Sequence, residues 1–82
     1  MTGGKFAERF HPGEYVREEI AERKWSIRDL AEKSGLGMDV VAGLITETYA
    51  VDEEIAYGLA RAFGTSWTMW LNLQKFYDEW EE

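Results

Sequence analysis

Hydrophobic residues in this chain recur at the spacing of an α-helix, and this periodicity is the feature that most restricts the fold. Apolar side chains return every third or fourth position in five successive stretches, and no stretch alternates apolar and polar residues long enough to indicate a strand. The predicted helices span residues 12–23, 26–34, 38–46, 52–63 and 66–79. A chain of 82 residues has room for these helices, tight turns and one core. We therefore expect a compact all-α domain.

Residues that favour helix ends lie at the boundaries of these stretches. Pro12 suits the first turn of a helix. Ser26 is a good N-cap, and Asp29, three positions later, can complete a capping box. Gly35 and Gly64 suit left-handed positions at helix C-termini. The first helix is expected to bury one stripe of side chains, which is Tyr15, Val16, Ile20 and Ala21.

The middle of the chain carries the pattern of two helices that cross closely. Ala31 is small enough to permit close approach, and Gly35 suits the turn. Val41 and Leu44 are spaced to hold the later helix against the earlier one. This stretch, which begins at Leu30, resembles a helix-turn-helix.

Three flanking motifs make the resemblance more specific, because they occur in the same register as in HigA-type antitoxins, a branch of the Xre family. They are His11–Glu14 with Arg17–Glu19, then Ala56–Ser66, and finally Trp70–Gln74 with Tyr77–Asp78. The resemblance implies a compact five-helix, lambda-repressor-like domain over residues 12–80, preceded by an N-terminal arm over residues 1–11. Members of this family usually dimerise, neutralise a small RNA-cleaving toxin and repress their own promoter. The resemblance therefore implies a cytoplasmic homodimer that binds a protein toxin and operator DNA.

The positions that read DNA in such a motif carry unusual side chains here. In the family pattern, the outward positions of the second motif helix are Met38, Asp39, Ala42, Gly43 and Thr46. None of them is basic, one is acidic, and three more have no side chain that could donate a hydrogen bond to a base edge. The cations close enough in sequence to contact phosphates are Lys24, Arg28 and Lys33, whereas Glu47 lies where a phosphate would be approached. We expect weakened or altered operator binding. This face has either lost its DNA contacts without gaining a new role, or it now meets a protein.

The last predicted helix is too apolar to pack on one side only. Four of its side chains can fill the core, and these are Trp70, Leu71, Leu73 and Tyr77. Four others have no evident cover, and these are Trp67, Met69, Phe76 and Trp80. Either the N-terminal segment covers them through Phe6 and Phe10, or they form a dimer or partner interface, where aromatic residues and Met are enriched.

Charge and composition bear on the remaining classes of function. The net charge is −7, and residues 52–82 hold seven acidic and two basic residues. This excess of acidic residues either serves solubility alone or also repels nucleic acid. The chain has no Cys and a single His, His11, so no metal site is expected. It has no apolar run near the roughly 18 residues of a membrane span, no secretion signal, no phosphate-binding loop and no nucleophile motif. We expect neither an enzyme nor a cofactor.

Two functions are compatible with these features. The first is a HigA-like antitoxin or small transcriptional regulator that dimerises, binds a protein partner and contacts its operator weakly. The alternative is a phage or mobile-element protein that uses the helix-turn-helix scaffold only to bind another protein.

Overall fold

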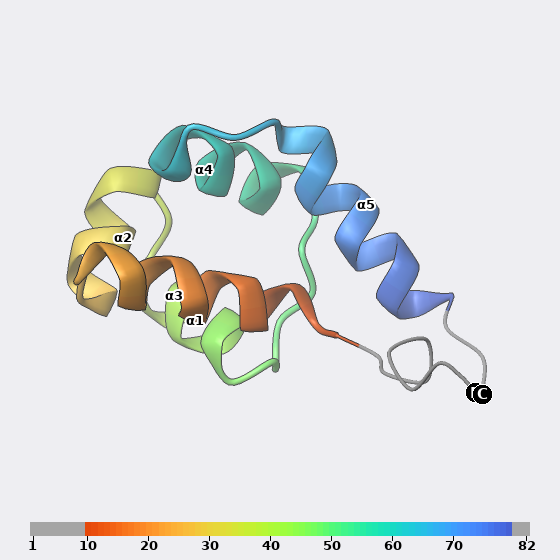
Figure 1. The fold of residues 1–82 in the computed structure, drawn as a ribbon, viewed down its shortest axis with the longest axis horizontal. Helices are drawn as coiled ribbons and strands as arrows, with labels where there is room; N and C mark the ends of the chain where they lie inside the picture. The colour runs from red at the N-terminus through yellow and green to blue at the C-terminus, as the bar shows by residue number, and fades with distance from the viewer. Residues whose placement is uncertain (1–9, 80–82) are drawn as a thin grey trace.

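The computed structural model describes residues 10–79, and in this range the chain forms five α-helices and no strand (Figure 1). The helices are α1 (Pro12–Arg23), α2 (Ile27–Ser34), α3 (Met38–Ile45), α4 (Glu53–Phe63) and α5 (Trp67–Asp78). The prediction of an all-α, five-helix fold is confirmed. Of the residues singled out from the sequence, Phe6 and Trp80 lie outside the described residues.

The helix ends follow the local signals in the sequence. Ser26 and Asp29 form a complete capping box, in which each backbone N–H donates to the other residue's side chain at 2.9–3.0 Å. The hydrogen bond from the Ser26 N–H lowers the pKa of the Asp29 carboxyl, because it stabilises the ionised form. Gly35 and Gly64 adopt left-handed conformations at the ends of α2 and α4, with φ of 76° and 73°.

His11 has a structural role that the sequence did not reveal. It is the N-cap of α1, and its Nδ1 accepts a hydrogen bond from the Gly13 N–H at 2.9 Å. The imidazole is buried and meets the ring of Tyr77 on α5 edge-on, with 4.9 Å between centroids. His11, assigned to the N-terminal arm from the sequence, thus joins the start of α1 to α5.

The core gathers one apolar stripe from each helix. Its buried hydrophobic members are Val16, Leu30, Ala31, Val41, Leu44, Val51, Ile55, Ala56, Leu59, Phe63 and Trp70. The stripe predicted for α1 is partly wrong, because Tyr15 and Ala21 are exposed while Val16 is buried. At about 3.6 residues per turn, Tyr15 and Ala21 point away from the side of α1 that carries Pro12, Gly13 and Val16. The buried stripe of α1 is therefore narrower than its apolar composition suggests.

The helices pack in pairs around this core. α3 packs against α1 and α2, α4 packs against α2, and α5 packs against α4 and α1 (Figure 1). The approach of α1 to α3 is so close that a Cβ atom at Gly13 would lie 1.9 Å from the Leu44 carbonyl oxygen. None of the described helices is both long enough and apolar enough to cross a membrane.

Candidate nucleic-acid interface

α2, the turn at residues 35–37 and α3 form the unit that the sequence pattern predicts. Leu30 and Ala31 of α2 are buried against Val41 and Leu44 of α3 in the common core. The turn is stabilised by the buried hydroxyl of Ser34, which accepts a hydrogen bond from the Leu36 N–H at 3.2 Å. Because α3 is held by this inner side, its other side faces outward.

The outward side of α3 offers little polar chemistry. It carries Met38, Asp39, Ala42 and Thr46, and we call these four residues the reading edge. The Thr46 hydroxyl donates to the Ala42 carbonyl oxygen at 3.0 Å, and an Asp39 carboxylate oxygen accepts from the Val40 N–H at 3.0 Å. Met38 is 48 % exposed and presents a thioether. The reading edge therefore has no cationic or amide side chain that could donate to bases or phosphates.

Gly43 was predicted to belong to this edge, and the structure places it elsewhere. Gly43 is buried, and a Cβ atom added to it would lie 2.8 Å from the ring of Tyr49. The loop after α3 folds back over it, since the N–H groups of Thr48 and Tyr49 both donate to the Gly43 carbonyl oxygen, at 2.7 and 3.1 Å. The glycine thus makes room for the tyrosine ring and is unavailable to a duplex.

The C-terminal end of α3 is stabilised by Arg17 from α1. One guanidinium nitrogen donates to the carbonyl oxygen of Ile45, and the other forms an ion pair with Glu47 at 3.1 Å. Glu47 has a left-handed φ of 64° just after the helix. Glu47, predicted to oppose phosphates, is thus partly neutralised by a residue 30 positions earlier, and no local pattern could have shown this.

The predicted phosphate contacts lie on α2 and on the turn that precedes it. Lys24 adopts a left-handed conformation at the end of α1, and Arg28 is exposed in the first turn of α2. The Lys33 ammonium lies 4.9 Å from the centroid of the Trp25 ring, in cation–π geometry. We call Lys24, Arg28 and Lys33 the basic flank.

Three consecutive acidic residues lie where α4 begins. Asp52 caps the helix, since its carboxylate accepts from the Ile55 N–H at 2.9 Å, and Glu53 and Glu54 follow in the first turn. All three are exposed. Carboxylates stabilise a helix N-terminus, but they also occupy the positive end of the dipole that could otherwise attract a phosphate. We call Asp52, Glu53 and Glu54 the acidic flank.

The apolar surface of α5 is divided into two parts. Trp67 packs against Tyr57 of α4, with ring centroids 4.9 Å apart. Met69 and Phe76 are 38 % and 57 % exposed and flank the half-buried Leu73 at helical spacing, so we call these three residues the α5 ridge. The prediction had grouped Trp67 with Met69 and Phe76, but they belong to different sides of the helix.

Gln74, like His11, has a structural role that the sequence did not reveal. It is buried between α5 and the loop before α4, where its Oε1 accepts from the Val51 N–H at 2.8 Å. Its Nε2 donates to Asp78 at 2.9 Å. Its place on the core side of α5, four residues after Trp70, is the signal that could have indicated burial.

The described part of the chain contains no group of three or more metal-ligating side chains. Two crossed helices, a glycine turn and an exposed second helix define the class of helix-turn-helix DNA-binding proteins. The chain belongs to the helix-turn-helix family, whose model matches residues 16–70. This family consists of non-enzymatic DNA-binding proteins, which agrees with the exclusion of catalysis.

Individual relatives refine this assignment. The chain is 33 % identical over 70 residues to the HTH-type transcriptional regulator YddM of Escherichia coli K12, covering 85 % of this chain and 74 % of YddM. It is similar to a HigA-family addiction module antidote protein from Coxiella burnetii, at TM-score 0.81 and 33 % identity over 87 % of this chain and 78 % of that one. It is also similar to the Pseudomonas aeruginosa antitoxin HigA, solved with the higBA promoter, at TM-score 0.82 and 32 % identity over 87 % and 78 % of the two chains. The resemblance to HigA-type antitoxins is confirmed.

Proposed function

We propose that this chain is a cytoplasmic, HigA-like antitoxin and transcriptional regulator that forms a homodimer, binds a protein toxin and contacts its operator only weakly. The observation that carries the proposal is the reading edge, where Met38, Asp39 and Thr46 are exposed and no side chain is basic or an amide. A solved relative with its promoter supports the DNA-binding role, and the side chains of the reading edge support its weakness.

The expected weakness follows from the size of the contacts that are missing. A bidentate base contact supplies about 1–3 kcal/mol of discrimination, and neutralised phosphates supply most of the affinity. Met38 and Ala42 can offer only apolar contact with thymine methyl groups. The phosphate contacts then depend on Lys24, Arg28 and Lys33, on α2 and the turn before it.

The proposed dimer uses the α5 ridge. Met69, Leu73 and Phe76 are spaced by four and three residues, which is the spacing of a seam between two packed helices. In the sequence, Trp80 continues this spacing. A two-fold axis through such a seam would bury the same apolar ridge on both copies, as closed dimers require.

Fluorescence anisotropy with the protein's own upstream duplex and a scrambled duplex tests the DNA-binding part of the proposal. We expect sequence-selective binding at about 50 mM salt that falls steeply by about 200 mM salt. Tight selective binding at the higher salt would contradict the weakened reading edge, and absence of selectivity at both salts would contradict operator binding. Light scattering on the wild type and a Phe76→Glu variant tests the dimer, with the wild type expected to be dimeric and the variant monomeric.

A second candidate function is a protein-binding module that no longer contacts DNA, as in a phage or mobile-element protein. The observation that favours it is the acidic flank, which places three carboxylates at the start of α4. The two functions differ in one result, because this module would bind neither duplex at any salt while still binding its protein partner.

A further inference from the structure

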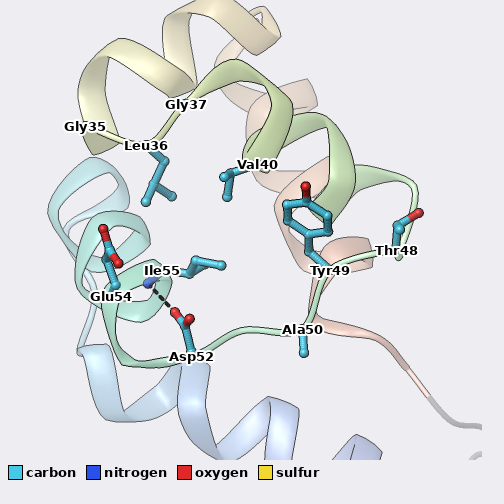
Figure 2. A pocket seen from close by; sticks show the side chains of 10 residues that line it. All are labelled: Gly35, Leu36, Gly37, Val40, Thr48, Tyr49, Ala50, Asp52, Glu54 and Ile55. Atoms are coloured by element: carbon cyan, nitrogen blue, oxygen red, sulfur yellow. Dashed lines mark hydrogen bonds between the residues drawn. The ribbon is translucent and has the colours of Figure 1, made fainter.

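A hollow separates α3 from the start of α4, and it is distinct from the α5 ridge. Its volume is about 490 Å³, and its walls come from the α2–α3 turn, from α3, from the loop after α3 and from the first turn of α4 (Figure 2). Pockets of about 300–1,000 Å³ are typical of sites that hold a small molecule.

The inner walls of the hollow are apolar. Leu36 and Val40 project into it from the turn and from α3, and Ile55 faces them from α4 (Figure 2). Ile55 is buried, while Leu36 and Val40 are half-buried and belong to the outer layer of the core. The ring of Tyr49 adds an aromatic wall and remains 39 % exposed. These walls favour an apolar chain segment over solvent.

The rim of the hollow is acidic. Asp52 and Glu54 both line it and are both exposed, and none of the described residues that line it is Lys or Arg. The hydrogen bond from the Ile55 N–H fixes Asp52 through one carboxylate oxygen, so its charge is held at the mouth of the hollow. Phosphates are repelled from such a rim, whereas cations are attracted.

We propose that this hollow binds a Lys- or Arg-bearing segment of a protein partner. The aliphatic stem of a Lys or Arg side chain packs along Leu36, Val40 and Ile55, while its charged head reaches Asp52 and Glu54. A guanidinium group can also stack on the Tyr49 ring. The site rests on the protein-binding part of the proposed function, but it needs neither DNA binding nor the α5 dimer, so its failure would leave those two parts intact.

Nuclear magnetic resonance of the full-length chain tests the site with a short peptide of alternating Leu and Arg. We expect the peptide to perturb the methyl signals of Leu36, Val40 and Ile55. Replacing each Arg of the peptide with citrulline keeps its shape and removes its charge, and this peptide should bind more weakly. Removing the protein's two charges in an Asp52→Asn and Glu54→Gln variant should weaken binding of the Arg peptide by about two- to thirty-fold. Asn retains the capping ability of Asp, so α4 should be preserved.

The matched control is a Glu22→Gln and Glu32→Gln variant, which loses the same charge from exposed sites on α1 and α2 that do not line the hollow. It should bind the Arg peptide like the wild type. Equal weakening in both variants, equal binding of the citrulline peptide, or perturbations confined to the α5 ridge would each overturn the proposal. Methyl shifts at Val40 that depend on protein concentration without peptide would also overturn it, since they would assign the hollow to a second copy of the chain.

Discussion

The basic flank and the acidic flank carry opposite charges, the first on α2 and the turn before it, the second at the start of α4. α2, which packs against α3, carries Arg28 and Lys33, and Lys24 lies on the turn before it. The charged side chains at the start of α4, across the hollow from α3, are all carboxylates. A duplex lying on α3 would therefore gain phosphate contacts on one side and meet repulsion on the other.

This difference separates the scaffold of the helix-turn-helix from the charge on its surface. The packing of α2 on α3 depends on buried aliphatic side chains, which no charge on either flank disturbs. The partner preference depends on exposed side chains, most of which lie outside the core. Scaffold and partner preference can therefore be tested separately, and the following substitutions do so.

The largest expected effect is a gain of duplex binding from Ala42→Arg. This substitution puts a cationic fork in the middle of the reading edge, where one bidentate contact supplies about 1–3 kcal/mol, or about five- to 150-fold in affinity. Anisotropy with the upstream duplex measures the gain, and Asn72→Arg on exposed α5 is the control for added charge. If Ala42→Arg binds no better than Asn72→Arg, the reading edge does not face DNA. Arg at position 43 is unsuitable, because it would displace the Tyr49 ring.

The next effect is on stability, and it concerns the ion pair that neutralises Glu47. Arg17→Met removes the charged donor from the Ile45 carbonyl oxygen and leaves Glu47 unpaired. We expect a loss of about 1–2 kcal/mol in the free energy of unfolding. The loss should be smaller than for a fully buried hydrogen bond from a charged group, because the Arg17 side chain is 42 % exposed. Urea unfolding measures it. Glu47→Gln is the control, because it removes the ion pair but keeps the hydrogen bond from Arg17 to the Ile45 carbonyl oxygen. It should lower the free energy of unfolding by less than about 0.5 kcal/mol. If both variants lose the same free energy of unfolding, the stabilisation comes from the ion pair alone.

A smaller effect is expected from reversing charge on the acidic flank. Glu53→Lys with Glu54→Lys leaves the Asp52 cap intact and should strengthen duplex binding by about two- to thirty-fold at low salt. The salt dependence should steepen by about two in the slope of log affinity against log salt, since two more phosphates can be neutralised. Arg28→Ala, on the basic flank, should weaken duplex binding and make its salt dependence shallower. Binding that responds to neither substitution would remove the contrast between the flanks.

The smallest effect concerns the pH dependence of stability, through Asp29 in the capping box of α2. The pKa of Asp29 is lowered in the folded chain by the Ser26 N–H, so its contribution to stability is present above the unfolded-state pKa of about 3.9. The contribution is lost as the pH falls through the lowered value. The Asn side chain of an Asp29→Asn variant cannot ionise, so the variant lacks this contribution at every pH. The difference in free energy of unfolding between the wild type and the variant should therefore shrink below about pH 3.9. Urea unfolding between neutral pH and pH 3 measures this deficit, and a deficit independent of pH would contradict the assignment.

Much of the fold could be predicted from the sequence because helices depend on nearby residues. The capping box at Ser26 and the left-handed Gly35 and Gly64 involve partners within a few positions, and all three are confirmed. The apolar period likewise predicted a helix in each of the five stretches where the structure has one.

The site could be predicted only in part, because exposure depends on what the rest of the chain covers. Met38, Asp39 and Ala42 follow from the helical period and the family pattern. Gly43 does not, since the loop after α3 returns to place Tyr49 over it. The spacing of apolar residues cannot show which side of a helix a later loop will cover.

By itself the sequence determined the helices, their ends, the family and the missing cations on α3, because each depends on residue type and short spacing. Only the tertiary structure decided the contact of His11 with Tyr77, the Arg17 contact with the end of α3, and the hollow with its acidic rim. These features join residues far apart in the chain, so they exist only after the helices have packed against one another.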